Sequence, residues 1–172
     1  MSYAINVVLR NLPVWRAFLV EIRNAKPGEA AKLTALARKA KSHWPYQDEL
    51  LSRMLDALEI SSTSVRRGIF IVAEEQQRLI GVAGVEHTEH GWELEHLWID
   101  PAEMGKGLGR RLLSEILDQC LTRGLSELTF TSDPHAEGFY ERMGANKTGV
   151  RASTVIPGRE LTVFSITRDS LL

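Results

Sequence analysis

With 172 residues, 44% of them hydrophobic and 25% charged, the chain has the size and composition of one globular domain with a sizeable core. Its formal net charge of −1 provides no basic field for nucleic acid, and no apolar run is long enough to span a membrane. The one cysteine, Cys120, cannot form an internal disulfide, which fits a reducing compartment. The sequence therefore predicts a cytoplasmic protein with neither nucleic-acid nor membrane partners.

The first residues differ in character from the rest. Residues 1–18 are apolar but interrupted by polar residues and a proline, and they lack the basic start and cleavage site of a signal peptide. We interpret them as an N-terminal extension, and residues 19–172 as the domain. The sequence leaves open whether the extension packs on its own domain or on a second subunit, so a homodimer is one assembly to test.

Short strands and helices are expected over the first third of the domain. Residues 19–23 alternate and predict a strand, and residues 27–40 predict a helix that opens on Pro-Gly-Glu. Trp44-Pro45-Tyr46 interrupts that helix, and apolar residues at a spacing of three to four predict a second helix over 50–58. The run of Ser and Thr at 61–64 is interpreted as a polar loop.

Three strands then follow one another. Residues 68–74, 79–86 and 92–99 are rich in apolar and β-branched side chains and are separated by short polar turns. Strands joined by tight turns pair with their sequence neighbours, so these segments predict an antiparallel meander.

A glycine-rich loop follows the meander. Asp100-Pro101 ends the third strand, because proline lacks the N–H that a ladder needs. Gly105, Gly107 and Gly109 then lead directly into a helix over 108–121 with one apolar stripe. The first turn of a helix has unpaired N–H groups and the positive end of the dipole, so the pattern indicates an anion site for a phosphate-bearing ligand. Lys106, Arg110 and Arg111 add positive charge nearby.

Two other phosphate motifs compete for this loop. A Walker loop needs Ser or Thr after its lysine, and Gly107 follows Lys106 here, which excludes it. A dinucleotide fingerprint has the spacing G-x-G-x-x-G, whereas this loop has G-x-G-x-G. Asp133 follows the next strand, so dinucleotide binding stays open as the weaker alternative.

The remaining segments complete the sheet. The helix crosses to a strand over 125–131, which should lie parallel to residues 92–99. A helix over 133–143 and a hairpin of 148–156 with 160–167 follow. The predicted fold class is therefore mixed α/β, with a sheet of about seven strands and helices on both faces.

Two motifs in this order resemble those of the GNAT superfamily of N-acetyltransferases. Residues 104–109 match its (Gln/Arg)-x-x-Gly-x-(Gly/Ala) loop, and Asp133, Ala136, Tyr140 and Gly144 match its Asn-x-x-Ala-x-x-x-Tyr segment that runs into a glycine. The resemblance covers roughly residues 20–168. Met104 and Asp133 depart from the pattern: Met104 removes a side-chain donor but leaves the backbone amides, and an ionised Asp133 can accept but not donate.

The resemblance implies a single GNAT-like domain with a splayed parallel strand pair and acetyl-CoA as the cosubstrate. It implies direct transfer of acetyl to a primary amine of a small molecule or a peptide. No metal is expected, because the spacing of the histidines at 43, 87, 90 and 135 is not that of zinc ligands. The residues expected to bind the cofactor are Leu97, Trp98, Ile99, Met104, Gly105, Lys106, Gly107, Leu108, Gly109, Arg110, Asp133, His135 and Tyr140.

Three residues are the catalytic candidates. Tyr140 matches the family's tyrosine, and its phenol could protonate the leaving thiolate. Glu93 and Glu95 are two residues apart and are expected on one face of their strand, where either could deprotonate the amine directly or through a water. His96 is expected on the opposite face, in the core or the pocket. Packing against the cofactor for Tyr140 and a surface charge pair for the glutamates are the alternatives.

The acceptor side carries less information. Trp44-Pro45-Tyr46 either borders the acceptor pocket or packs the two helices together. A non-catalytic acyl-CoA-binding regulatory module is the main functional alternative to the enzyme. No motif names the acceptor.

Overall fold

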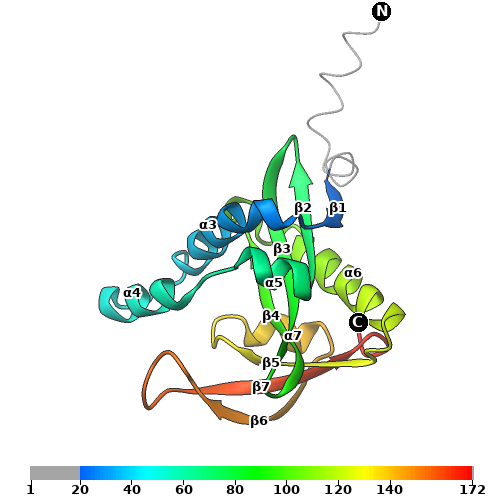
Figure 1. Cartoon of the computed structure of the whole chain (residues 1–172). Helices are drawn as coiled ribbons and strands as arrows, with labels where there is room; N and C mark the ends of the chain where they lie inside the picture. Colours follow the sequence, from blue (N-terminus) through cyan, green and yellow to red (C-terminus); the bar gives the residue numbers. More distant parts are fainter. Residues whose placement is uncertain (1–19, 172) are drawn as a thin grey trace, which may run out of the picture.

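The computed structural model describes residues 20–171, and the predicted N-terminal extension over 1–18 lies outside the described residues. One seven-stranded sheet runs through the domain in the order β1-β2-β3-β4-β5-β7-β6 (Figure 1). Its strands are β1 (Glu21–Asn24), β2 (Ile69–Glu75), β3 (Arg78–Thr88), β4 (Gly91–Ile99), β5 (Glu127–Ser132), β6 (Asn146–Ala152) and β7 (Glu160–Thr167). The expected mixed sheet with an antiparallel meander β2-β3-β4 is confirmed.

Helices cover both faces of this sheet. They are α3 (Ala30–Lys41), α4 (Asp48–Ala57), α5 (Ser62–Arg67), α6 (Leu108–Thr122) and α7 (Glu137–Arg142), with the 3-10 turns η2 (Pro27–Glu29) and η3 (Pro101–Glu103). Among residues 20–171 no helix has both the length and the apolar character needed to cross a bilayer.

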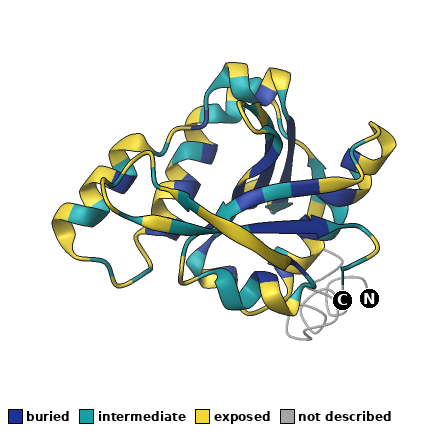
Figure 2. Ribbon diagram, turned by 90° about the horizontal axis from the view of Figure 1, so that it is seen from below, coloured by how far each residue is buried: buried dark blue, intermediate teal, exposed yellow. Residues whose placement is uncertain are grey.

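Alternation along β2 divides the core into two layers. Ile69 and Ile71 pack against α6, whereas Phe70 and Val72 pack against α3. The apolar stripe predicted for residues 108–121 is the buried face of α6, and Leu112, Leu113 and Ile116 have no exposed surface. Figure 2 shows the resulting buried band through the centre of the sheet, with exposed residues at its rim.

Two local predictions were wrong at helix ends. The loop expected at 61–64 is the start of α5, because the Ser61 side chain accepts the Ser64 N–H and so caps the helix. The helix expected from residue 133 begins only at Glu137. The residues before it form a turn, in which the Asp133 side chain accepts the N–H of His135 at 3.0 Å.

A β-bulge in β4 changes which way its side chains point. Leu94 pairs with Val85 and His96 with Gly84, so Glu95 is an extra residue without a partner on β3. Leu94 and Leu97 consequently both pack on the α6 side, although strict alternation would put them on opposite faces. The ring of His96 packs near that of Phe70 on the α3 side, with ring centroids 5.7 Å apart.

This bulge overturns one expectation about the glutamates. Glu93 and Glu95 do not share one strand face opposite His96, because the inserted residue shifts the alternation by one. Glu93 is 1% exposed, while Glu95 is exposed.

The parallel pair of β4 and β5 is the point at which the sheet opens. Only one residue pair, Glu93 with Thr129, joins the two strands. Beyond it, β4 continues to pair with β3 through Ile99, and β5 continues to pair with β7 through Ser132. The facing edges of β4 and β5 therefore carry backbone groups without a strand partner in the described residues.

Glu93 is a buried charge whose partner comes from the far end of the sheet. Its carboxylate accepts hydrogen bonds from Arg151 at 2.8 Å and from Thr88 at 2.6 Å. We expect Arg151→Met to lower the free energy of unfolding by about 3 kcal/mol, because the buried carboxylate loses its counter-charge. Urea unfolding would measure this, and adding Glu93→Gln should recover part of the loss.

Lys147 provides the matched control for this prediction. It also lies on β6 and pairs with Glu137 and Glu141, but near the surface. Lys147→Met should cost clearly less than Arg151→Met. Equal losses for the two variants would show that the Glu93 pair contributes no more than a surface pair.

Candidate functional site

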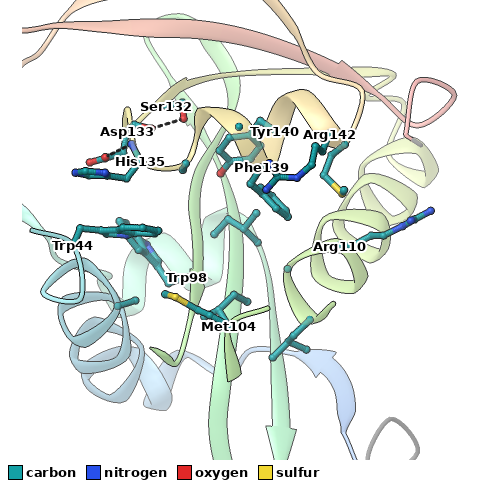
Figure 3. Close-up of a pocket in the computed structure, with 18 of the residues that line it drawn as sticks. Trp44, Trp98, Met104, Arg110, Ser132, Asp133, His135, Phe139, Tyr140 and Arg142 are labelled. Carbon is teal, nitrogen blue, oxygen red and sulfur yellow. Dashed lines mark hydrogen bonds between the residues drawn. The ribbon is translucent and has the colours of Figure 1, made fainter. Parts of the chain in front are cut away.

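A cleft of about 560 Å³ opens where β4 and β5 separate (Figure 3). Its walls are the ends of β4 and β5, the glycine loop, the first turn of α6, the short α7 and the end of α3. The volume is in the range of small-molecule sites. All the sequence-predicted site residues line it except Glu93 and Lys106.

Backbone amides form the floor of one end of this cleft. Gly105 and Gly107 have φ angles of +75° and +81°, which side-chain-bearing residues rarely adopt, and open space lies on the side where a Cβ would point. Gly107 is the N-cap of α6, and the first helical bond runs from the Arg111 N–H to its carbonyl. The N–H groups of residues 108–110 thus have no partner within the helix and are available to an anion.

The side-chain charges at this end differ from those expected. Lys106 does not line the cleft, and its ammonium donates to the Ala102 carbonyl at 2.6 Å and to the Glu103 carboxylate at 3.0 Å. Arg111 donates to the carbonyl of Val20. Arg110 lines the cleft as expected, and Arg142 of α7 lines it as well. Within residues 20–171 neither Arg110 nor Arg142 forms an ion pair.

Arg142 is a cleft residue that the sequence patterns did not predict. It lies two residues after Tyr140, in a segment that had already been singled out. Its position four residues after Gly138 would put both on one side of a helix, and both line the cleft. That spacing was the available signal.

The buried carboxylate of Asp100 holds the start of the glycine loop in place. The Asp100 carboxylate accepts hydrogen bonds from Lys39 of α3 at 2.9 Å, from Arg78 of β3 at 3.1 Å and from the Ala102 N–H at 3.1 Å. Burial opposes its ionisation, but these hydrogen bonds and charges outweigh burial and hold the pKa of Asp100 below its usual range. The start of the glycine loop is therefore tied to both α3 and the sheet.

Tyr140 lies in the middle of the cleft wall. Its ring packs against Phe130 at 4.4 Å and Phe139 at 5.1 Å. Its hydroxyl forms no hydrogen bond in the described part of the chain and points into the cleft in Figure 3. Burial, with a contribution from Asp133, raises the pKa of this phenol, so the group keeps its proton at neutral pH.

The two glutamates have separate surroundings. Glu95 lines the cleft, and although the residue is exposed overall, partial desolvation of its carboxyl, aided by the charges of Glu93 and Glu86, raises the pKa of that group above its usual value. Glu93 lies behind it, bound to Arg151 and Thr88. Of these two glutamates, only Glu95 lines the cleft.

His96 takes a structural position. Its Nδ1 accepts the Trp98 indole N–H at 3.2 Å, and its Nε2 lies 3.2 Å from Glu86. Since Nδ1 accepts, the proton of the neutral ring is on Nε2. The histidine thus orients Trp98, which lines the cleft.

The other end of the cleft is aromatic. Trp44, from the connection between α3 and α4, stacks on His135 with ring centroids 5.1 Å apart and an interplanar angle of 1°. Both rings line the cleft, at the end away from Arg110 (Figure 3). Trp44 therefore borders the cleft, while Tyr46 packs the connection by donating its hydroxyl to Asp133.

Comparison with known proteins identifies related sequences. A family model described as an acetyltransferase (GNAT) domain matches residues 46–154, which is more than half of the chain. Histone acetyltransferase TAP1 of Glycine max is 29% identical over 121 residues, covering 64% of this chain and 51% of that protein. N-acetyltransferase 8 of Homo sapiens is 29% identical over 120 residues, covering 64% and 53%. The chain thus spans about half the length of these curated relatives.

A solved structure shares the fold. The PaiA N-acetyltransferase of Thermoplasma acidophilum, in complex with coenzyme A, aligns with a TM-score of 0.70 at 18% identity. The alignment covers 86% of this chain and 98% of that one. The likeness extends over nearly all of the described residues, so the seven-stranded sheet and its opening belong to a known architecture.

Proposed function

This chain belongs to the GNAT acetyltransferase family, and we propose that it transfers the acetyl group of acetyl-CoA directly to a primary amine of a small molecule or peptide. The observation that carries the proposal is the cleft at the splayed strands, with helix amides at one end that have no partner within α6 and the Glu95 carboxyl in its lining. A cytoplasmic location and a homodimeric assembly stay predictions.

The described residues fit the shape and charge of coenzyme A. The diphosphate would take the amides of residues 108–110, and the glycines at 105 and 107 let it approach closely. Arg110 and Arg142 would supply the positive charge. The edge of β4 over Leu97–Ile99, which pairs with no strand within residues 20–171 on its β5 side, would bond the amide groups of the pantetheine arm, as one strand bonds another.

The chemistry follows from what the cleft brings together. Glu95 takes the proton of the acceptor ammonium, directly or through a water, and the free amine attacks the thioester carbonyl. A β4 N–H stabilises the oxygen on which charge develops. The C–S bond then breaks, and the thiolate takes the proton of Tyr140 while the second proton of the attacking nitrogen passes to the Tyr140 oxygen, directly or through a water, so that the phenol is regenerated and the amide is neutral. Holding both reactants in one cleft supplies much of the rate enhancement.

Departures from the family pattern are tolerated in this arrangement. Met104 still lines the cleft but has no side-chain N–H, so phosphate binding rests on backbone amides and the two arginines. Asp133 binds other side chains of the protein, as described below, and we propose no direct role for it in holding acetyl-CoA.

Gly107→Glu tests the amide cradle. We expect acetyl-CoA at saturation to raise the melting temperature of the wild type by several degrees and to leave the variant unshifted, because the new carboxylate repels the diphosphate. Differential scanning fluorimetry measures both. Gly124→Glu is the control, since Gly124 also has a positive φ (+79°) and open space but lies at the far end of α6.

The outcomes of this experiment separate the functional alternatives. A rise in the melting temperature with NAD but none with acetyl-CoA would favour dinucleotide binding. A shift with acetyl-CoA, but no thiol release with any member of a broad amine panel, would select the non-catalytic acyl-CoA-binding module.

The pH dependence of turnover tests Glu95. Its carboxyl must be ionised to act as a base, and its pKa is raised, so kcat/KM should fall as pH decreases through a value above the ordinary ~4.3 of glutamic acid. Glu95→Gln should lower kcat/KM by about a hundredfold and remove that acidic limb. A variant with an unchanged pH profile would exclude Glu95 as the base.

Tyr140→Phe tests the proton donor. The substitution keeps the ring in its aromatic packing and removes only the hydroxyl. We expect kcat to fall about tenfold or more, with little change in the KM for acetyl-CoA, because the phenol acts on the departing thiolate. Steady-state kinetics with a thiol-reactive dye measure this, and unchanged turnover would leave Tyr140 with a packing role alone.

A further inference from the structure

Asp133 is the centre of a polar cluster that joins four separate segments. Its carboxylate accepts hydrogen bonds from Lys41 at the end of α3 and from the Tyr46 hydroxyl in the α3–α4 connection. Arg159, just before β7, lies 3.7 Å from the same carboxylate and donates to the Tyr46 hydroxyl at 3.4 Å. We call Lys41, Tyr46, Asp133 and Arg159 the Asp133 cluster.

The cluster is largely shielded from solvent. The side chains of Lys41, Asp133 and Arg159 are 11%, 17% and 18% exposed. Burial opposes ionisation of Asp133, but the hydrogen bonds from Lys41 and Tyr46 outweigh it and lower the pKa of the carboxyl. Desolvation and the neighbouring carboxylate raise the pKa of Tyr46 to about 12. At neutral pH the cluster therefore holds one anion between two cations.

The oxygens of Asp133 are engaged within the protein. Oδ1 accepts hydrogen bonds from the Tyr46 hydroxyl and the His135 N–H, and Oδ2 accepts a hydrogen bond from the Lys41 ammonium. This carboxylate therefore has little capacity left for a ligand, and its partners lie on the aromatic side of the cleft. The same bonds fix the backbone of the two segments that carry Trp44 and His135.

The Asp133 cluster joins the two segments that carry these rings. Trp44 lies two residues before Tyr46, and His135 lies two residues after Asp133, so the bond between Tyr46 and Asp133 brings their segments together. The rings stack in parallel at 5.1 Å and line the cleft opposite the end at Arg110 (Figure 3). Since acetyl-CoA is assigned to the arginine end, this aromatic wall faces the acceptor.

We propose that Asp133 is a positioning residue for the acceptor: the cluster holds the Trp44–His135 pair as the wall that the incoming amine meets, and it does not bind acetyl-CoA. The inference rests on the proposed function for the identity of the two ends of the cleft. It assigns acceptor selectivity to contacts between α3, the α3–α4 connection and the segment before β7, which no sequence motif marks.

Asp133→Asn separates the two roles, because asparagine keeps the shape of the side chain and removes its charge. We expect the KM for the acceptor to rise about tenfold, since displacement of a substrate-facing wall weakens its alignment. The Kd for acetyl-CoA should stay within twofold. A raised Kd for acetyl-CoA with an unchanged KM for the acceptor would overturn the proposal.

Further variants test the cluster as a unit. Lys41→Met and Tyr46→Phe should reproduce the rise in acceptor KM, while Lys41→Arg, which retains the cation, should restore values near those of the wild type. Combining Lys41→Met with Asp133→Asn should cost little more than either alone. Asp118→Asn is the control, because it breaks an ion pair with Arg168 that lies away from the cleft.

An activity-independent measurement keeps this inference distinct from the proposed function. Acrylamide quenching of Trp44, isolated as the difference from Trp44→Phe, should increase about twofold in Asp133→Asn, because the stacked pair opens. Unchanged quenching would overturn the inference. If wild-type protein binds no acetyl-CoA and acetylates no amine, the proposed function fails, whereas quenching still decides whether the cluster holds the wall.

Discussion

The separation of β4 from β5 after a single residue pair is the constraint on which the site depends. In a continuous sheet the edge groups of Leu97–Ile99 would bond to the next strand. Here β3 continues to pair with β4, and β7 continues to pair with β5, so both strands stay ordered while, among residues 20–171, no strand pairs with their facing edges beyond Glu93 and Thr129. Backbone N–H groups that in a continuous sheet would bond to the neighbouring strand are thus available to a ligand.

The opening also explains why the two ends of the cleft differ. At one end the chain passes from β4 through the glycine loop into α6, which supplies amides, and Arg110 and Arg142 supply charge. At the other end α3 and its connection to α4 meet the residues after β5, which supplies the aromatic pair of Trp44 and His135. Tyr140 lies between them, with its ring in the core and its hydroxyl at the surface of the cleft.

Three carboxylates with buried surroundings hold these walls in place. Glu93 binds Arg151, Asp100 binds Lys39 and Arg78, and Asp133 binds Lys41. Buried ion pairs contribute little net stability, since desolvation offsets much of their attraction. Each of the three ties segments that are distant in sequence, and the pairs of Asp100 and Asp133 do so next to the cleft. The carboxyl of Glu95, in contrast, has a pKa above its usual value and lines the cleft, where we propose that it acts as the base.

Local patterns in the sequence were sufficient for the fold and for one end of the site. The stripe on α6, the three-strand meander and the glycine loop each depend on residues a few positions apart, so periodicity and φ preference determine them. The amide cradle follows from the same local chemistry. Ser61 shows the limit of this reasoning, because a polar run serves equally as a loop or as a helix cap.

Only the tertiary structure decided the rest. The bulge at Glu95 reverses the orientation of the residues after it, and one extra residue in a strand leaves no mark in its composition. Asp133 meets Lys41 and Tyr46 across 92 and 87 residues, and the short α7 places Arg142 in the cleft. These contacts depend on how packed elements approach each other, which is a property of the whole sheet and its helices and not of any one segment.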